Sequence, residues 1–157
     1  MNRILLVEDN PDDVELTLLA FERSKLTNVV TVARDGVEAL AILHGSGDQP
    51  PQLPFALVLL DLKLPRIDGF EVLREIVRHD GDVGRVTGII AVSGDATPVT
   101  CQMMLCAGAD DFISRPFQNG EFALRVRRIA HRTRALRRAL GYARLLEGHL
   151  RDGQQAD

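Results

Sequence analysis

The chain has 157 residues, enough for one domain with a full hydrophobic core. Hydrophobic residues make up 45% of it and charged residues 26%, as in an ordinary globular protein. The net charge of −3 excludes a uniformly basic protein, although arginines gather toward the C-terminus. No apolar run approaches the roughly 18 residues that a membrane span needs.

Two features bear on the cell compartment. The first ten residues, MNRILLVEDN, contain too few consecutive apolar residues for the core of a signal peptide. Cys101 and Cys106 lie in a predicted helix and lack CxxC spacing, so we expect reduced thiols rather than a disulfide or a metal pair. We therefore expect a cytoplasmic protein.

Five short apolar runs alternate with helical patterns along the chain. Each run is too short for a helix and lacks the alternation of a half-exposed strand, which favours strands of a parallel sheet covered on both faces. The predicted strands are residues 4–7, 29–33, 56–60, 88–92 and 112–113.

Helix-start signals follow each predicted strand. In chain order the helices begin at Asn10 with Pro11, at Asp35, at Asp68, at Thr97 with Pro98, and at Gln118 or Asn119. A loop rich in Gly and Pro at 44–54 precedes the third strand. Five βα units with right-handed crossovers predict a doubly wound, flavodoxin-like α/β fold of three layers, with parallel sheet order 2-1-3-4-5 and an extended C-terminal helix.

Carboxylates follow two of the predicted strands. Glu8 and Asp9 come directly after the first strand, and Asp61 follows the third. These strands should be neighbours where the strand order reverses, so the three carboxylates should meet in one pocket. Such a pocket of oxygen ligands, with room for water, is what Mg²⁺ prefers. Glu8 and Asp9 alone also fit an acidic helix N-terminus, an alternative that the convergence with Asp61 disfavours.

Asp61 also fits a nucleophile. A carboxylate can accept a phosphoryl group and form an aspartyl phosphate, while a metal ion offsets the charge of the incoming oxygens. Ser93 ends the fourth strand and Arg115 follows the fifth, which brings a hydroxyl and a cation to the same edge of the sheet. Each of these residues alone is commonly structural, but together they suit one reaction.

Four stretches resemble the receiver domain of response regulators in two-component signalling. They are ILLVEDNPDD, LLDLKLPRIDGFEVL, AVSGD and AGADDFISRPF, in that order and at the family's spacing. The resemblance implies a bacterial phosphoprotein of a phosphorelay that takes its phosphoryl group from a sensor histidine kinase and has no separate substrate. The NPDD start and the long loop before the third strand further resemble the small regulators paired with bacterial phytochrome kinases.

The resemblance implies a role for each acidic residue at this edge. Asp61 would be the phosphoacceptor. Asp9 would bind Mg²⁺ directly and Glu8 mainly through water, and the backbone carbonyl of Lys63 would complete the protein ligands. A phosphohydrolase that uses Asp61 as nucleophile is a disfavoured alternative, because such enzymes need a second acid where Lys63 stands.

Three further positions can be compared with the family: Ser93 and Phe112, which match its switch residues, and Arg115, which departs from its pattern. Ser93 would bind a phosphoryl oxygen and move with it, and Phe112 takes the place of the switch aromatic, with plain core packing as the alternative. The family has lysine where Arg115 stands. A guanidinium could bind phosphoryl oxygens bidentately or could crowd the pocket. The alternative function is therefore a receiver-like protein that signals mainly by dimerisation or protein contact, with impaired phosphorylation.

The helical pattern continues past the expected end of such a domain, which predicts a receiver domain at 1–130 and a helical extension at 131–157. Its apolar residues alternate spacings of four and three, as in a dimerising coiled coil. We expect a second copy to contact Phe122, Val126, Ile129, Leu136, Leu140 and Leu146. The arginines would lie at the rim and reach acidic surface on a partner. Nucleic-acid binding is a disfavoured alternative, because no output domain fits in the extension.

Overall fold

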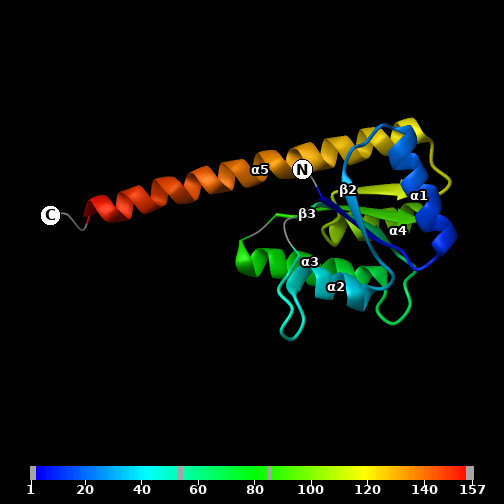
Figure 1. The fold of residues 1–157 in the computed structure, drawn as a ribbon, viewed down its shortest axis with the longest axis horizontal. Helices are drawn as coiled ribbons and strands as arrows, with labels where there is room; N and C mark the ends of the chain where they lie inside the picture. The colour runs from blue at the N-terminus through cyan, green and yellow to red at the C-terminus, as the bar shows by residue number, and fades with distance from the viewer. Residues whose placement is uncertain (1–2, 53–54, 85, 155–157) are drawn as a thin grey trace.

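The computed structural model describes residues 3–52, 55–84 and 86–154, with the side chains of these residues except at 83, 142 and 145–154. The described strands form one sheet in the order β2-β1-β3-β4-β5, and every pairing in it is parallel. Helices cover both faces of the sheet (Figure 1). The predicted doubly wound, three-layer fold is therefore confirmed.

The elements alternate strictly along the described chain. The strands are β1 (Arg3–Val7), β2 (Val29–Ala33), β3 (Phe55–Asp61), β4 (Gly88–Ser93) and β5 (Asp111–Ser114). The helices are α1 (Pro11–Arg23), α2 (Gly36–His44), α3 (Gly69–Val83), α4 (Pro98–Cys106) and α5 (Asn119–Gln154). None of these helices is both long and apolar enough to cross a membrane.

The helices that follow β1 to β4 begin at the residues that the sequence predicts. Side-chain oxygens of Asn10, Asp35, Asp68 and Thr97 each accept a backbone N–H of the first helical turn. Such caps satisfy donors that would otherwise be left unpaired at a helix start. They also fix the length of each strand-to-helix loop, and these loops carry the residues described below.

The hydrophobic core consists of one cluster on each face of the sheet. In β3, which is buried throughout, Val58 and Leu60 belong to the cluster with residues of α2 and α3, while Leu57 and Leu59 belong to the cluster with residues of α1 and α5. This alternation is the two-residue period of a strand between two layers. At the sheet edge, β2 departs from the prediction of full coverage, because Val29 is 45% exposed.

The first part of α5 lies in the core rather than on the surface. Phe122, Val126 and Ile129 are each no more than 2% exposed and pack beneath the sheet. Gly88 of β4 allows this approach, since a Cβ there would lie 2.6 Å from Oγ1 of Thr133. These three apolar residues are therefore unavailable to a second copy, and their predicted role as dimer contacts is wrong.

Arginines of α5 bind acidic residues at the start of β5. Arg125 and Arg128 pair with the two carboxylate oxygens of Asp111 at 2.7 and 2.5 Å. Arg132 pairs with Asp110 at 3.2 Å. These arginines hold the helix to its own domain, and their contact with a partner stays a prediction.

Two further arginines attach the helix beyond residue 130. Arg137 donates to the carbonyl oxygens of Val86, at 2.7 Å, and of Phe55. Arg144 donates to the carbonyl oxygen of Gly84 at 2.7 Å. The residues past Arg144 continue the helix away from the sheet (Figure 1). The boundary predicted at residue 130 thus falls inside one continuous helix.

One residue after α1 has a conformation that its side chain disfavours. Lys25 is exposed and has a φ of +53°, where a Cβ is strained and glycine is not. Lys25→Gly should raise the free energy of unfolding by about 0.5–1 kcal/mol, the relief of left-handed strain less the added chain entropy of glycine. Urea denaturation measures it. Lys25→Ala keeps the Cβ and should give no gain; equal gains would contradict the assignment.

Candidate functional site

The pocket lies at the edge of the sheet where β1 and β3 end. Val7 of β1 pairs with Leu60 of β3, so the residues that follow them, Glu8 and Asp61, lie side by side. Carboxylate oxygens of Glu8, Asp9 and Asp61 all lie within 4.8 Å of one another. The structure thus brings together the three acids that the sequence predicts to converge.

The loop after β3 holds Asp61 in place through its backbone. The N–H of Leu62 donates to the carbonyl of Val92 at 3.2 Å, and the N–H of Gly69 donates to the carbonyl of Leu62 at 3.0 Å. A Cβ on Gly69 would lie 2.5 Å from the carbonyl oxygen of Asp61. Glycine is therefore required at the start of α3 for this close approach.

Arg115 reaches into the pocket from the segment after β5. Its Nη2 lies 2.5 Å from Oδ1 of Asp61, and its Nη1 lies 3.0 Å from Oε2 of Glu8. Nη1 also lies 2.6 Å from Oδ2 of Asp13. The side chain is only 17% exposed, and its Nε is buried without a hydrogen-bond partner among the described residues. The guanidinium therefore pairs with the carboxylates that the sequence assigns to metal and phosphoryl binding.

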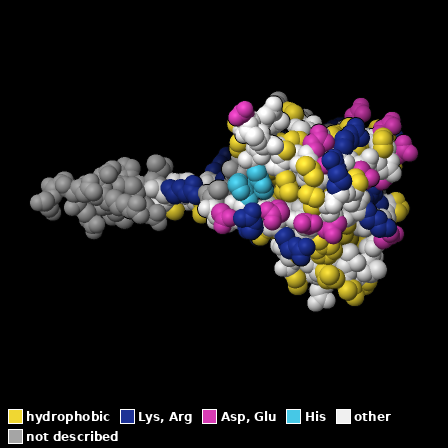
Figure 2. All heavy atoms as spheres, turned by 90° about the horizontal axis from the view of Figure 1, so that it is seen from below, with side chains coloured by type: hydrophobic (Ala, Val, Ile, Leu, Met, Phe, Trp, Pro, Cys, Tyr) yellow, Lys and Arg dark blue, Asp and Glu magenta, His cyan; other side chains and the backbone are white. Residues whose placement is uncertain are grey.

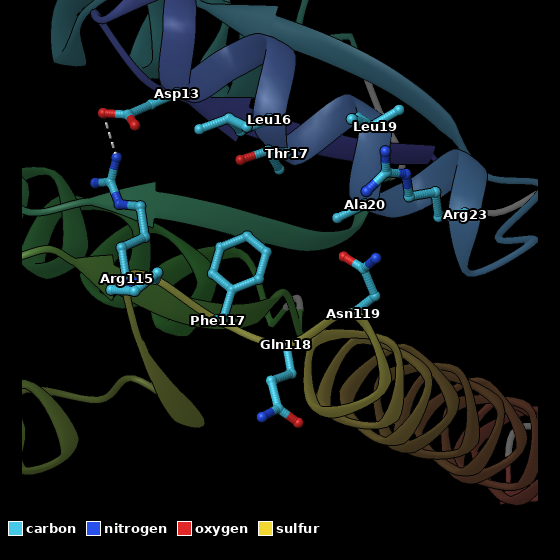
Figure 3. Close-up of a pocket in the computed structure, with 11 residues that line it drawn as sticks. Asp13, Leu16, Thr17, Leu19, Ala20, Arg23, Arg115, Phe117, Gln118 and Asn119 are labelled. Carbon is cyan, nitrogen blue, oxygen red and sulfur yellow. Dashed lines mark ion pairs between the residues drawn. The ribbon is translucent and has the colours of Figure 1, made fainter.

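Asp13 is a member of this cluster that the sequence alone does not single out. It projects from α1 toward Arg115 (Figure 3). The signal that could have found it is its spacing from Thr17 and Ala20, which are buried on α1. Residues four and seven apart share a helix face, so Asp13 faces the interior side of the helix.

The other side of the pocket is lined by Lys63 of the loop after β3 and by Gly94 and Asp95 of the loop after β4, and Ser93 lies behind this lining at the end of β4. Ser93 is 3% exposed, and its Oγ accepts the backbone N–H of Asp95 at 3.1 Å. The Lys63 ammonium pairs with the Asp95 carboxylate. Together with Glu8, Asp9, Asp13, Asp61 and Arg115, these loops line an open cavity of about 360 Å³. A water molecule takes about 30 Å³, so the cavity has room for a hydrated ion.

Two predicted site features have weaker links to this pocket. Phe112 is buried in the core cluster between the sheet and α2 and α3, which agrees with core packing and leaves its switch role a prediction. Lys63 lines the pocket, and metal binding by its carbonyl likewise stays a prediction.

Burial changes the acidity of the central carboxylates. Burial raises the pKa of Glu8 to about 7, against the opposing hydrogen bond from the N–H of Asn10. Burial also raises the pKa of Asp61 to about 6, partly offset by the charge of Arg115. Both groups thus resist ionisation, which is the expected state of acids that share a buried pocket with one cation.

The donor set fits a hard divalent cation. All the ligand atoms offered by Glu8, Asp9 and Asp61 are carboxylate oxygens, the type that Mg²⁺ prefers. One guanidinium among four acids, these three and Asp13, leaves the ionised pocket with excess negative charge. A divalent cation would offset that charge, so the residues present suit Mg²⁺.

Comparison with known proteins agrees with this geometry. The profile described as response regulator receiver domain matches residues 4–127. The transcriptional regulatory protein CpxR of Klebsiella pneumoniae is 34% identical over 134 residues, which are 85% of this chain and 51% of CpxR. The two-component response regulator ORR41 of Oryza sativa is 34% identical over 116 residues, which are 74% of this chain and 84% of ORR41. The chain spans about half the length of CpxR.

Two solved structures of bacteriophytochrome response regulators also match. RtBRR has 36% sequence identity and a TM-score of 0.70, with 82% of this chain and 78% of that chain covered. AtBRR has 37% identity and a TM-score of 0.67, with 80% and 91% covered. The predicted resemblance to regulators of this group is confirmed.

The raised pKa of Glu8 predicts how stability depends on pH. Because the folded state binds this proton more tightly than the unfolded state, the contribution of Glu8 is full below its unfolded value of 4.5 and is lost as pH rises through about 7. Glu8→Gln cannot ionise, so without divalent cations it should melt at a higher temperature than the wild type, by more at about pH 8 than at about pH 5.

Circular dichroism melts in a chelator measure this difference. Glu15→Gln, at an exposed position of α1, is the matched control and should show no comparable gain. A Glu8→Gln protein that is less stable than the wild type at the higher pH would show that the ion pair with Arg115 outweighs the burial of Glu8.

Proposed function

This chain belongs to the response regulator receiver domain family, and from that premise we propose that Asp61 accepts a phosphoryl group from a sensor histidine kinase in a two-component phosphorelay. The observation that carries the proposal is the convergence of Glu8, Asp9 and Asp61 in one cavity at the carboxyl edge of the sheet. The protein would promote its own phosphorylation and dephosphorylation, without a separate substrate.

The transfer needs an ionised carboxylate at Asp61. Its pKa of about 6 leaves it mostly ionised at neutral pH. One of its oxygens forms the new bond to phosphorus as the bond from phosphorus to the kinase histidine nitrogen breaks, and the imidazole then takes a proton from solvent. Mg²⁺, when bound by the acids and the carbonyl of Lys63, supplies the charge that offsets the phosphoryl oxygens.

Ser93 and Arg115 supply the remaining contacts to the phosphoryl group. Ser93 lies at the end of β4, next to Val92, which pairs with Asp61. Arg115 is already within ion-pair distance of Asp61, so its guanidinium has only to exchange a carboxylate oxygen for phosphoryl oxygens. Charge-assisted bonds from a guanidinium to such oxygens are short and strong.

The switch in this proposal runs from Ser93 to Phe112. A hydroxyl that binds the phosphoryl oxygen would draw the end of β4 toward Asp61. Ala91 of β4 pairs with Phe112 of β5, so a shift of β4 would reach the aromatic ring through its own strand partner. Phe112 would then change its packing without needing a hydroxyl.

The partner kinase in this proposal is of the bacterial phytochrome type, and the signalling takes place in the cytoplasm. The likeness to RtBRR and AtBRR, at 36% and 37% identity, supports the kinase. Free Cys101 and Cys106 suit a reducing compartment.

One observation favours a second candidate function. Arg115 pairs with Asp61 and Glu8 at once, and this contact stands where a metal ion and a phosphoryl group would bind. If the guanidinium holds these carboxylates too tightly, phosphorylation is impaired and the protein signals mainly through protein contacts.

The extension past residue 130 supports self-association in this proposal. Leu136 and Leu140 lie one turn apart on α5 and are each 41% exposed. Two copies that pair through the same stripe would form a two-fold contact and bury these side chains. The predicted contact Leu146 lies outside the described side chains. We keep residues 1–130 as the phosphoacceptor domain and 131–157 as its dimerisation arm.

Asp61→Asn should abolish the phosphorylation of this protein. An amide cannot act as the nucleophile, and no other acid combines a strand-end position with the neighbouring carboxylates and Ser93. Intact mass after incubation with Mg²⁺ and a small phosphodonor measures the gain of one phosphoryl group. Asp95→Asn, at the rim of the same cavity, is the control and should still be phosphorylated. An undiminished gain in Asp61→Asn rejects the assignment.

A double substitution of Leu136→Glu and Leu140→Glu should convert a dimer into a monomer. Charges on the paired stripe would repel and would lose their water on association. Size-exclusion chromatography with light scattering measures the mass. Leu124→Glu, at a 68% exposed position elsewhere on α5, is the control and should leave the dimer intact. A full-length wild type that elutes as a monomer, with and without a phosphoryl analogue, contradicts self-association.

A further inference from the structure

Asp13 binds the terminal nitrogen of Arg115 that does not contact Asp61. Nη1 of Arg115 is shared between Asp13 at 2.6 Å and Glu8 at 3.0 Å, while Nη2 contacts Asp61 at 2.5 Å. Asp13 is therefore the third acid of this guanidinium, and it comes from a different element, α1. Two of the three acids that contact Arg115, Glu8 and Asp61, belong to the group of carboxylates that could hold a metal ion, and Asp13 does not.

Mg²⁺ and the guanidinium compete for the same carboxylates. Glu8 and Asp61 belong to the group whose oxygens lie close enough to hold an ion together, a group that does not include Asp13 among the described residues. Two cations also repel one another at this range. A metal ion that binds Glu8 and Asp61 therefore weakens the contacts of Arg115 with both carboxylates, whereas the contact of Arg115 with Asp13 is compatible with the metal.

The structure has space on the Asp13 side for this displacement. A second cavity, of about 650 Å³, lies between α1 and the segment that leads from β5 into α5. Asp13 and Arg115 line both cavities. Figure 3 shows the two side chains facing one another beside this opening, with Leu16 and Phe117 along its walls. The guanidinium thus has open space beside Asp13 into which it can turn away from Glu8 and Asp61 while keeping its contact with Asp13.

We propose that Asp13 is a positioning residue that retains Arg115 at the edge of the pocket when Mg²⁺ binds, and that it thereby sets the affinity for Mg²⁺. The inference rests on the proposed function, because it concerns the metal of that same site. Without Asp13, the guanidinium has only metal-binding carboxylates as partners, and it competes with the ion. With Asp13, the arginine yields those carboxylates and stays within reach of phosphoryl oxygens on Asp61.

A simpler role for Asp13 makes a different prediction. A fourth acid near the metal raises its affinity through charge alone, whether or not an arginine is present. The positioning role acts through Arg115 and largely disappears when that side chain is neutral. A double-mutant cycle separates the two roles, since it measures whether one substitution has the same effect in both backgrounds.

The cycle compares four full-length proteins: wild type, Asp13→Asn, Arg115→Met, and the double variant. Isothermal titration with Mg²⁺ alone gives each affinity. Arg115→Met should bind Mg²⁺ more tightly than the wild type, because it lacks the competing cation. Asp13→Asn should weaken binding at least about threefold in the wild-type background, within the range of coupling between contacting side chains, and by a clearly smaller factor in the Arg115→Met background.

Asp12→Asn is the matched control. It makes the same change of charge on the same helical turn, at an exposed position, and should leave the affinity close to that of the wild type. Thermal melts of each variant establish that it is folded.

The possible failures are distinguishable. If Asp13→Asn weakens Mg²⁺ binding by the same factor in the wild-type and Arg115→Met backgrounds, the positioning role is wrong, but the proposed metal site is not contradicted. A weakening by Asp12→Asn as large as that by Asp13→Asn would also overturn it. If no protein of the cycle shows heat or a melting shift with Mg²⁺, both the metal site and this inference are wrong.

Discussion

The guanidinium of Arg115 lies among the carboxylates of Glu8, Asp9, Asp13 and Asp61 in one pocket, and the rest of the site depends on how their charge is balanced. Glu8, Asp9 and Asp61 are brought together by the topology of the sheet, because β1 and β3 are neighbours and end at the same edge. Ionised acids so close repel one another and resist loss of water, which is why burial raises the pKa of Glu8 and of Asp61. A nearby cation offsets the repulsion between these acids, and the guanidinium of Arg115 supplies one from within the chain.

Arg115 has different partners in the structure and in the proposed phosphoryl transfer. The pocket needs positive charge both before and during phosphoryl transfer, but the two states need it in different places. In the structure the guanidinium pairs with Asp61, the proposed nucleophile, and with Glu8, a proposed metal ligand. During transfer it would face phosphoryl oxygens while Mg²⁺ takes the carboxylates. The proposed reaction therefore includes an exchange of cations, in which Asp13 would offer the arginine a partner outside the proposed metal ligands.

The sequence predicts the fold and the three central acids well, because both follow from local patterns and a common topology. Caps such as Asn10 and Asp68 mark the helix starts, and apolar runs mark the buried strands. The sequence does not predict which partner Arg115 chooses or that Asp13 is among them, since those contacts depend on side-chain packing between distant elements. It also misplaces Phe122, Val126 and Ile129, because one apolar stripe along a helix fits a domain core as well as a dimer.

Arg115 contacts the carboxylates that the proposed reaction needs, Glu8 for the metal and Asp61 for the metal and the phosphoryl group, and it therefore competes with both. The most direct test is the rate at which Arg115→Lys gains one phosphoryl group from a small phosphodonor at limiting Mg²⁺, where competition for the carboxylates is felt, measured by intact mass against the wild type. A lysine ammonium is a compact charge on a flexible chain and lacks the planar fork that holds two carboxylates at once. Competition by Arg115 predicts faster phosphorylation of Arg115→Lys. A slower or unchanged rate would contradict it, and would mean that the guanidinium does not hinder the reaction.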